Sequence, residues 1–273
     1  MIHDDQIKHI EDWTEKLLSI GKSSFSLAEL KEALPQKTHS AIKLALLRLS
    51  KKKKILSIHK GYYLITNPQQ ASQGRIQPSL FVDNLMKYLN RDYYVGMLNA
   101  AAFHGSSHQQ PQEFYIFTTF PVLRPTAKNG FKINYISRKS IPFGLLENKK
   151  TETGYLKISK PIQTAIDLIQ FETRIGGLNR ASTVINELAE TIKPIDVSSS
   201  LLDSSPVTAL QRLGYILEKE LEFKGLADEI YKLLVENNKT LFRIPLKASK
   251  AIKGFHSDER WKVIVNTKIE VDE

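Results

Sequence analysis

A long stretch of this chain carries cationic side chains and no carboxylates. Between Glu32 and Asp83 there is no acidic residue, whereas the same stretch contains nine lysines and arginines, four of them in the run from Lys51 to Lys54. A surface that approaches a phosphate backbone gains from Lys and Arg, and each carboxylate weakens it by repelling the phosphates. The pattern therefore predicts contact with a nucleic acid.

Three helices are expected in and before this stretch. Apolar residues recur at helical spacing over residues 5–20, which predicts a first helix. A capping-box sequence at residues 26–29 predicts a second, short helix. Thr38 supplies an N-cap for a third helix that runs to about residue 52. Two short helices joined by so tight a turn indicate a helix-turn-helix.

A β-hairpin is expected directly after the third helix. Residues 55–59 and 62–65 are rich in β-forming types, and Lys60-Gly61 between them is a two-residue turn with Gly at its second position. Three helices followed by a hairpin is the order of a winged helix-turn-helix. The sequence therefore predicts a DNA-binding domain over residues 1–68, in which the hairpin is the wing.

The third helix has an apolar arc and a polar arc. The apolar arc is expected to pack on the other helices and consists of Ile42, Ala45, Leu46 and Leu49. Helix-turn-helix proteins place the N-terminal half of such a helix against base edges, while nearby cations contact phosphates. The residues expected to contact DNA are Lys37, Thr38, His39, Ser40, Lys43, Leu47, Arg48, Lys51, Lys52, Lys53, Lys60 and Tyr62.

Two features of this surface have a second interpretation. A run such as Lys51 to Lys53 is often only a solvated helix end that interacts with the helix dipole. Leu44 and Leu47 are apolar residues on a predicted solvent face, and they either touch thymine methyl groups or pack against another element. The coincidence of basic helix, acid-free stretch and hairpin favours DNA contact.

Length and composition predict a second, larger domain. The 273 residues with 41% apolar content suffice for about two globular domains. Residues 67–78 are polar and rich in turn formers, so we expect a linker at residues 69–78 and a second domain over residues 79–273. The expected fold class is α+β, an N-terminal winged helix-turn-helix followed by a larger mixed α/β C-terminal domain.

The second domain is predicted to combine helices with an antiparallel sheet. Helices are expected over residues 79–89, 95–104, 162–171 and 178–192, from Pro206 to Gly225, and from there to about residue 237. Strands are expected over residues 113–120, 131–137, 155–158, 241–245 and 261–269.

Four segments form an ordered set of motifs. They are Lys60-Gly61-Tyr62-Tyr63, then Tyr93 to Gly105 (YYVGMLNAAAFHG) followed by Pro111-Gln112, then Ile158 to Leu168 (ISKPIQTAIDL), and finally Trp261 to Glu270 (WKVIVNTKIE). In this order they resemble the AbiEi antitoxins of abortive-infection type IV toxin–antitoxin systems. Asn99 is a departure, because such proteins tend to have a serine at that position.

The resemblance implies two linked activities. In that family the N-terminal winged helix binds inverted repeats in the promoter of its own operon, and the C-terminal domain counteracts a nucleotidyltransferase toxin encoded next door. For this chain it implies a sequence-specific transcriptional repressor and antitoxin. The implied partners are double-stranded promoter DNA and the cognate toxin, the latter without need of a stable complex.

A few other side chains invite a chemical hypothesis. His104 before Gly105 is interpreted as a helix end whose imidazole bonds the last carbonyls. Asp167 lies within an apolar helical pattern and is interpreted as a structural hydrogen-bonding group. The alternative is a winged-helix-targeted nuclease or nucleotide-modifying enzyme with Asp167 or Glu270 as the active carboxylate. A scaffold whose basic surface binds RNA is a third hypothesis.

Composition also bears on cofactors, enzyme class and location. The chain has no cysteine, which fits a reducing compartment, and the acidic segments 256–259 and 270–273 match no metal-ligand spacing. It lacks P-loop, GxGxxG, HExxH and GxSxG motifs. Its first residues do not resemble a signal peptide, and no run of 18 apolar residues occurs. We therefore expect a soluble cytoplasmic protein that has no cofactor, binds no membrane and is not an enzyme.

Overall fold

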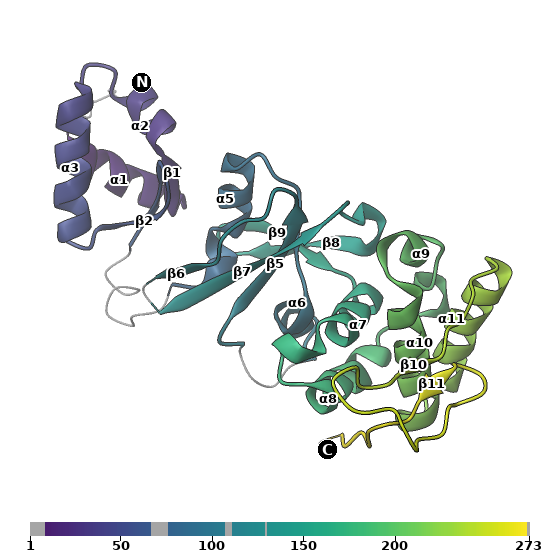
Figure 1. The fold of residues 1–273 in the computed structure, drawn as a ribbon. Coiled ribbons are helices and arrows are strands. Elements are labelled where there is room, and N and C mark those ends of the chain that lie inside the picture. The colour runs from purple at the N-terminus through teal and green to yellow at the C-terminus, as the bar shows by residue number, and fades with distance from the viewer. Residues whose placement is uncertain (1–8, 67–75, 107–110, 129, 272–273) are drawn as a thin grey trace.

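A computed structural model describes residues 9–66, 76–106, 111–128 and 130–271. The protein is a mixed α+β structure with several sheets. Figure 1 shows an N-terminal region (residues 9–66) at one end, a central sheet, and a group of helices toward the other end. Residues 76–271 are called the C-terminal region below. Most of the predicted linker at residues 69–78 lies outside the described residues.

The N-terminal region contains the expected three helices and hairpin. Its elements are α1 (Ile10–Ser19), β1 (Ser24–Ser26), α2 (Leu27–Ala33), α3 (His39–Lys51), β2 (Ile55–His59) and β3 (Tyr62–Ile65). The capping box of α2 is confirmed, because the side chains of Ser26 and Glu29 each accept a hydrogen bond from the other's backbone N–H. The sequence does not predict β1, which pairs with β3 and gives the sheet order β1-β3-β2.

Both faces of this small sheet are covered. On one face, Ile55 of β2 belongs to the core formed with α1, α2 and α3. On the other face, Ile58, Tyr62 and Leu64 join a cluster with α5 (Val82–Tyr88) and the central sheet of the C-terminal region. Alternate residues of a strand point to opposite faces, so one short hairpin contributes to two cores. The hairpin therefore packs against the C-terminal region.

The central sheet has six strands that run in mixed directions. Its order is β6 (Thr126–Lys128), β7 (Phe131–Arg138), β5 (Phe114–Thr119), β4 (Tyr93–Val95), β9 (Gly154–Ser159) and β8 (Leu146–Thr151). The pairs β5–β7 and β4–β9 are parallel, whereas the other neighbours are antiparallel. The predicted all-antiparallel sheet is therefore wrong. The chain leaves β5, forms β6 at the sheet edge and turns back into β7, so β7 runs in the direction of β5.

The helices of the C-terminal region mostly follow the predicted ranges. They are α5, α6 (Met97–Phe103), α7 (Pro161–Gln170), α8 (Leu178–Ala189), α9 (Ser200–Ser204), α10 (Val207–Tyr215), α11 (Lys224–Glu236), a π-helical turn (Ile216–Glu220) and 3-10 turns at Pro78–Leu80, Phe143–Leu145, Glu172–Arg174 and Pro194–Asp196. Two short strands, β10 (Ile244–Pro245) and β11 (Val263–Ile264), pair in parallel. Within the described ranges, no helix has both the length and the apolar character needed to cross a membrane.

The prediction that one helix runs from Pro206 to Gly225 is wrong. After α10 the chain continues through the π-helical turn and then breaks, and Glu222 has a φ of 63°. A positive φ at a non-glycine residue cannot continue a right-handed helix. Gly225, expected to end the helix, lies instead in the first turn of α11.

The core of the C-terminal region lies on both faces of the central sheet. One face packs on α5 and the hairpin, and the other packs on α6 and α7, behind which α8, α10 and α11 extend the same core (Figure 1). Gly214 of α10 lets the C-terminal segment approach closely, because a Cβ there would lie 2.0 Å from the ring of the fully buried Trp261. This contact fixes the β10–β11 segment against the helices.

Candidate nucleic-acid interface

α3 is held by its apolar arc and by its N-cap. Ile42, Leu46 and Leu49 are buried as predicted, and Ala45 is half-buried. The Oγ1 atom of Thr38 accepts a hydrogen bond from the backbone N–H of Ala41 at 3.2 Å, which confirms the predicted cap. In Figure 1 α3 is the outermost element of the N-terminal region.

The other arc of α3 faces away from the protein. Its residues are all exposed, and they are Ser40, Lys43, Leu44, Leu47, Arg48 and Lys51. We call these six residues the outer face of α3. It contains three cations and no carboxylate, and none of the three forms an ion pair with a carboxylate among the residues that the structure describes. Such a face is suited to bind a polyanion.

Carboxylates of α1 approach the lysine run at the end of α3. Glu11 pairs with Lys52 at 3.5 Å and with Lys54 at 2.6 Å, and Glu15 pairs with Lys54 at 3.2 Å. The hydrogen bond from Lys54 lowers the pKa of Glu11. Solvent-exposed pairs of this kind contribute little and exchange partners readily, so Lys52 is still able to reach a phosphate. Lys53 is exposed in the turn that follows α3.

Three more of the predicted contacts lie outside the outer face of α3. Lys37 is half-buried in the turn before α3, whereas His39 is exposed in the first helical turn. Lys60 is exposed in the hairpin turn, which is a separate element. Most of the predicted residues therefore lie along α3, whereas Lys60 lies in the turn between β2 and β3.

The hairpin turn is fastened to the C-terminal region by Tyr88 of α5. The Tyr88 hydroxyl donates to the carbonyl oxygen of Lys60 at 2.9 Å, and its ring lies 5.0 Å from that of Tyr62. Gly61 has a φ of 74°, and a Cβ at this position would come within 2.9 Å of the Tyr88 hydroxyl. Only glycine fits this turn without strain. The main chain of the hairpin turn is therefore held in place by α5.

Tyr62 is a correction to the predicted interface. Its side chain is only 3% exposed and its hydroxyl donates to Ser24 Oγ at 2.7 Å. Burial raises the pKa of Tyr62 to about 12. Because this ring packs inside the cluster shared by the two regions, it does not reach a bound nucleic acid. The alternation of Tyr62, Tyr63 and Leu64 contains a signal for this, since residues two apart share a strand face.

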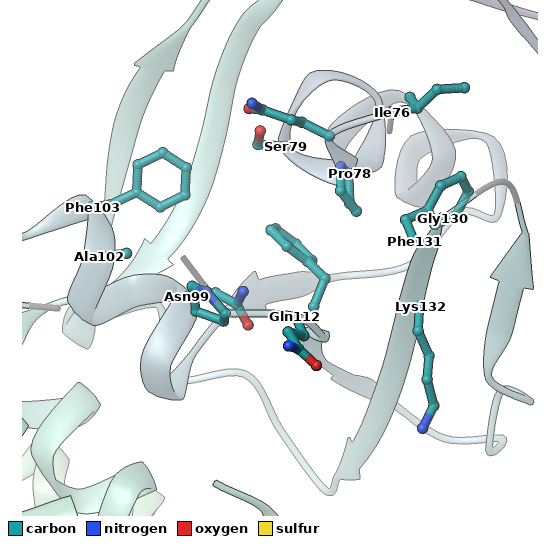
Figure 2. Close-up of a pocket in the computed structure, with 13 residues that line it drawn as sticks. Ile76, Pro78, Ser79, Asn99, Ala102, Phe103, Gln112, Gly130, Phe131 and Lys132 are labelled. Carbon is teal, nitrogen blue, oxygen red and sulfur yellow. The ribbon is translucent and has the colours of Figure 1, made fainter. Parts of the chain in front are cut away.

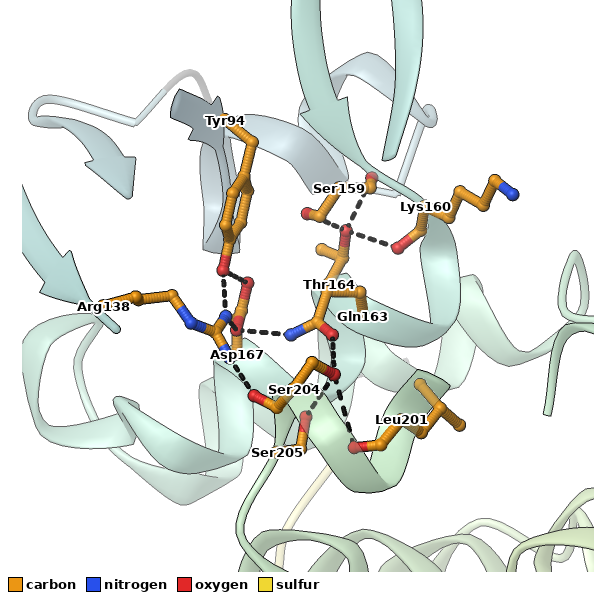
Figure 3. A network of polar contacts seen from close by, with 10 residues as sticks. All are labelled: Tyr94, Arg138, Ser159, Lys160, Gln163, Thr164, Asp167, Leu201, Ser204 and Ser205. Carbon is orange, nitrogen blue, oxygen red and sulfur yellow. Dashed lines mark hydrogen bonds and ion pairs between the residues drawn. The ribbon is translucent and has the colours of Figure 1, made fainter. Parts of the chain in front are cut away.

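Asp167, the alternative active-site carboxylate, lies in a buried polar network (Figure 3). It is fully buried and accepts hydrogen bonds from the Tyr94 hydroxyl at 3.0 Å and from Gln163 Nε2 at 2.8 Å. Arg138 pairs with it at 3.3 Å and also donates to the Tyr94 hydroxyl and to the carbonyl oxygen of Ser204. Burial raises the pKa of Asp167 to about 6, against the lowering effects of Arg138, Gln163 and Tyr94.

This network joins the sheet to the helices. Tyr94 lies on β4, Arg138 ends β7, Asp167 and Gln163 lie on α7, and Ser204 ends α9. Each carboxylate oxygen of Asp167 already has a partner within the protein, so the group acts as the structural hydrogen-bonding residue that the sequence predicts.

Glu270, the other alternative active-site carboxylate, is exposed and pairs with Lys268 at 3.8 Å. The described residues contain no group of three His, Asp or Glu side chains that could hold a metal ion.

His104 ends α6 but does not bond the helix carbonyls. Its Nε2 lies 2.8 Å from the carbonyl oxygen of Ser159 at the end of β9, and Gly105 follows with a φ of 83°. The predicted helix end is confirmed and the predicted partner of the imidazole is wrong. The ring instead connects α6 to the neighbouring strand.

A pocket of about 300 Å³ opens between the start of the C-terminal region and the sheet (Figure 2). Phe103, Phe114 and Phe131 give it an apolar lining. Two of its polar residues already have partners: Asn99 binds the backbone on both sides of Phe114, and Lys132 pairs with a carboxylate at 2.7 Å. Asn99 thus holds the start of β5, an interior strand of the central sheet, and has a structural role.

Comparisons with known proteins identify the C-terminal region. The family model for the AbiEi antitoxin C-terminal domain matches residues 94–219. These matched residues are called the AbiEi domain below. No curated protein matches the chain. Among solved structures, the RV2827C protein from Mycobacterium tuberculosis has a similar fold, with a TM-score of 0.67, 14% identity, and coverage of 93% of this chain and 90% of that one.

The AbiEi domain includes the complete network around Asp167. Its matched residues run from Tyr94 of β4 to Lys219 in the π-helical turn and contain Arg138, Asp167 and Ser204. The match excludes the outer face of α3, whereas the structural similarity extends over nearly the whole chain. The predicted AbiEi resemblance is therefore confirmed on the C-terminal region.

Three residues that shape these sites were not predicted from the sequence. They are Glu11, which pairs with the lysine run, Tyr88, which holds the hairpin turn, and Arg138, which pairs with Asp167. Each acts on a partner at least 28 residues away along the chain. No local pattern of residue types marks such a pair.

Proposed function

We propose that this protein is a transcriptional autorepressor and antitoxin. In this proposal α3 lies in the major groove of promoter DNA, and two copies of the chain bind an inverted repeat. The C-terminal region counteracts a nucleotidyltransferase toxin encoded in the same operon. Residues 1–68 serve as the winged helix-turn-helix, residues 69–78 as the linker and residues 79–273 as the antitoxin domain.

The observation that carries the DNA-binding half is the outer face of α3. It projects from the end of the molecule, with Lys43, Arg48 and Lys51 exposed and without carboxylate partners among the described residues. Lys60 is also exposed, in the turn of the hairpin that follows α3 in the sequence. The antitoxin half is supported by the AbiEi family match.

A gel mobility shift on the DNA upstream of the operon tests repressor activity. Wild-type protein is expected to retard a promoter fragment, and the Lys43→Ala, Arg48→Ala double variant is expected to bind it at least 10-fold more weakly, because two phosphate contacts are lost. A matched control removes two exposed lysines at the other end of the protein, Lys232→Ala with Lys239→Ala. No shift with any upstream fragment would refute the DNA-binding proposal.

Growth rescue tests the antitoxin half separately. Expression of the adjacent nucleotidyltransferase gene should arrest growth, and co-expression of this protein from an unrelated promoter should restore it. The Lys43→Ala, Arg48→Ala variant should rescue as well as wild type, because it changes nothing in the AbiEi domain. Failure of the wild-type protein to rescue would refute the antitoxin proposal without affecting the DNA-binding one.

A further inference from the structure

We infer that Leu44 and Leu47 read thymine methyl groups, and that the operator carries thymines beneath them in the major groove. This inference rests on the proposed function, because it concerns the same surface of α3. It begins from two exposed leucines one turn apart on the same helix: Leu44 is 54% exposed and Leu47 is 52% exposed. Both lie on the outer face of α3, which no other described element covers.

The two leucines lie near the middle of the outer face, Lys43 and Arg48 lie at its edges, and Lys51 follows along the middle one turn farther toward the C-terminus. With about 100° of rotation per residue, Leu44 and Leu47 lie on either side of Ser40, within about 60° of each other. Lys43 and Arg48 lie farther out on opposite edges, about 140° apart. When such a helix enters a groove, its middle faces the bases and its edges face the two phosphate walls.

Charge favours DNA over a protein as the occupant of this face. The leucines are surrounded by Lys43, Arg48 and Lys51, and no carboxylate belongs to the outer face. The apolar area that two half-exposed leucines offer is also far smaller than the roughly 800 Å² that each partner buries in a standard protein interface. DNA matches both the positive charge and the small apolar area of this face, because it is a polyanion whose major groove carries thymine methyl groups.

Only one of the four DNA bases presents a methyl group in the major groove. Thymine carries it at C5, whereas the other base edges there present hydrogen-bond donors and acceptors that a leucine cannot satisfy. A leucine that covers such an edge would leave its polar atoms without partners. Leu44 and Leu47 therefore select thymine by contact with its methyl group and by exclusion of polar edges.

Uracil scanning of the promoter duplex tests this inference. Each thymine is replaced in turn by deoxyuridine, which retains base pairing and loses only the methyl group, and affinity is measured by fluorescence anisotropy. At one or two positions per half-site we expect wild-type affinity to fall about four-fold, the value for roughly 0.8 kcal/mol of lost apolar burial. The Leu47→Ala or Leu44→Ala variant should bind thymine and uracil equally at one of these positions.

The control and the outcomes separate this inference from the proposed function. Arg48→Ala should weaken binding to the thymine and uracil duplexes by the same factor, because Arg48 lies at an edge of the outer face and its loss removes a phosphate contact only. If wild type binds the promoter but no thymine-to-uracil change alters affinity, the inference is wrong and DNA binding stands. If the leucine variants leave uracil sensitivity intact but convert a dimer to a monomer in sedimentation, the leucines contact another copy and the inference is wrong. Absence of any promoter binding refutes the proposed function itself.

Discussion

The outer face of α3 and the network around Asp167 use charged side chains in opposite ways. On α3 the cations Lys43, Arg48 and Lys51 are exposed and make no ion pair within the described chain. In the network Asp167 is fully buried, Arg138 is largely buried, and the two are bonded to each other and to neighbouring polar groups. The first set is available to a partner, whereas the second set joins the sheet of the AbiEi domain to its helices.

The difference predicts how each set responds to mutation. An exposed charge that binds no neighbour can be removed with little effect on folding. A buried charge that loses its partner is left without solvation, which is strongly destabilising. Stability and DNA affinity should therefore respond to different residues, and each prediction below tests this separation.

Arg138→Ala should have the largest effect on stability. It leaves the fully buried Asp167 without its cation, and we expect the free energy of unfolding in urea to fall by about 3–5 kcal/mol. Arg124→Ala is the matched control, because Arg124 is exposed. If both variants unfold at the same urea concentration as wild type, the network does not stabilise the AbiEi domain.

Leu46 and Leu47 are adjacent leucines on opposite faces of α3 and make a direct comparison. Leu46 is 6% exposed and Leu47 is 52% exposed. Leu46→Ala should lower the free energy of unfolding by about 2–4 kcal/mol, whereas Leu47→Ala should change it by less than about 0.5 kcal/mol. Equal losses of thermal stability would mean that the outer face packs against another part of the protein.

Asp167 should make stability depend on pH. Because burial raises its folded-state pKa from 3.8 to about 6, its contribution to stability is fully present below about pH 4 and is lost as pH rises through 6. The decline should amount to about 3 kcal/mol. The decline should be absent in Asp167→Asn. The unfolding free energy of wild type minus that of the variant should therefore fall by this amount between pH 4 and pH 7. A constant difference would contradict the raised pKa.

Periodicity predicted the local elements of the N-terminal region closely. The helical period of α3 separated its buried residues from its exposed ones, and the Lys60-Gly61 turn located both strands of the hairpin. The same reasoning failed for Tyr62, because it assigned the tyrosine by its proximity to the basic turn and not by its strand face. Which face of a strand is covered depends on a distant element, here α5.

Long-range arrangement was predicted least well. The strands β1, β4 and β6 contain three residues each, too few to show an alternating pattern, and the six residues of β8 are mostly polar. The pairing of β1, β4 and β6 in their sheets depends on contacts that form only in the folded chain. The Arg138–Asp167 pair could not be predicted from the sequence for the same reason, because β7 and α7 come together only in the folded protein. Sequence motifs nevertheless identified the AbiEi domain, because the order of several weak motifs is more specific than any one of them.

The salt dependence of promoter binding tests the central claim most directly, that the outer face of α3 is a phosphate-binding and base-reading surface. Affinity of wild-type protein, measured between 50 and 200 mM salt, should fall with a logarithmic slope of about −5, as expected for roughly six neutralised phosphates. For the Lys43→Ala, Arg48→Ala variant the slope should be smaller by about 2. An identical slope for the variant and for wild type would contradict the account.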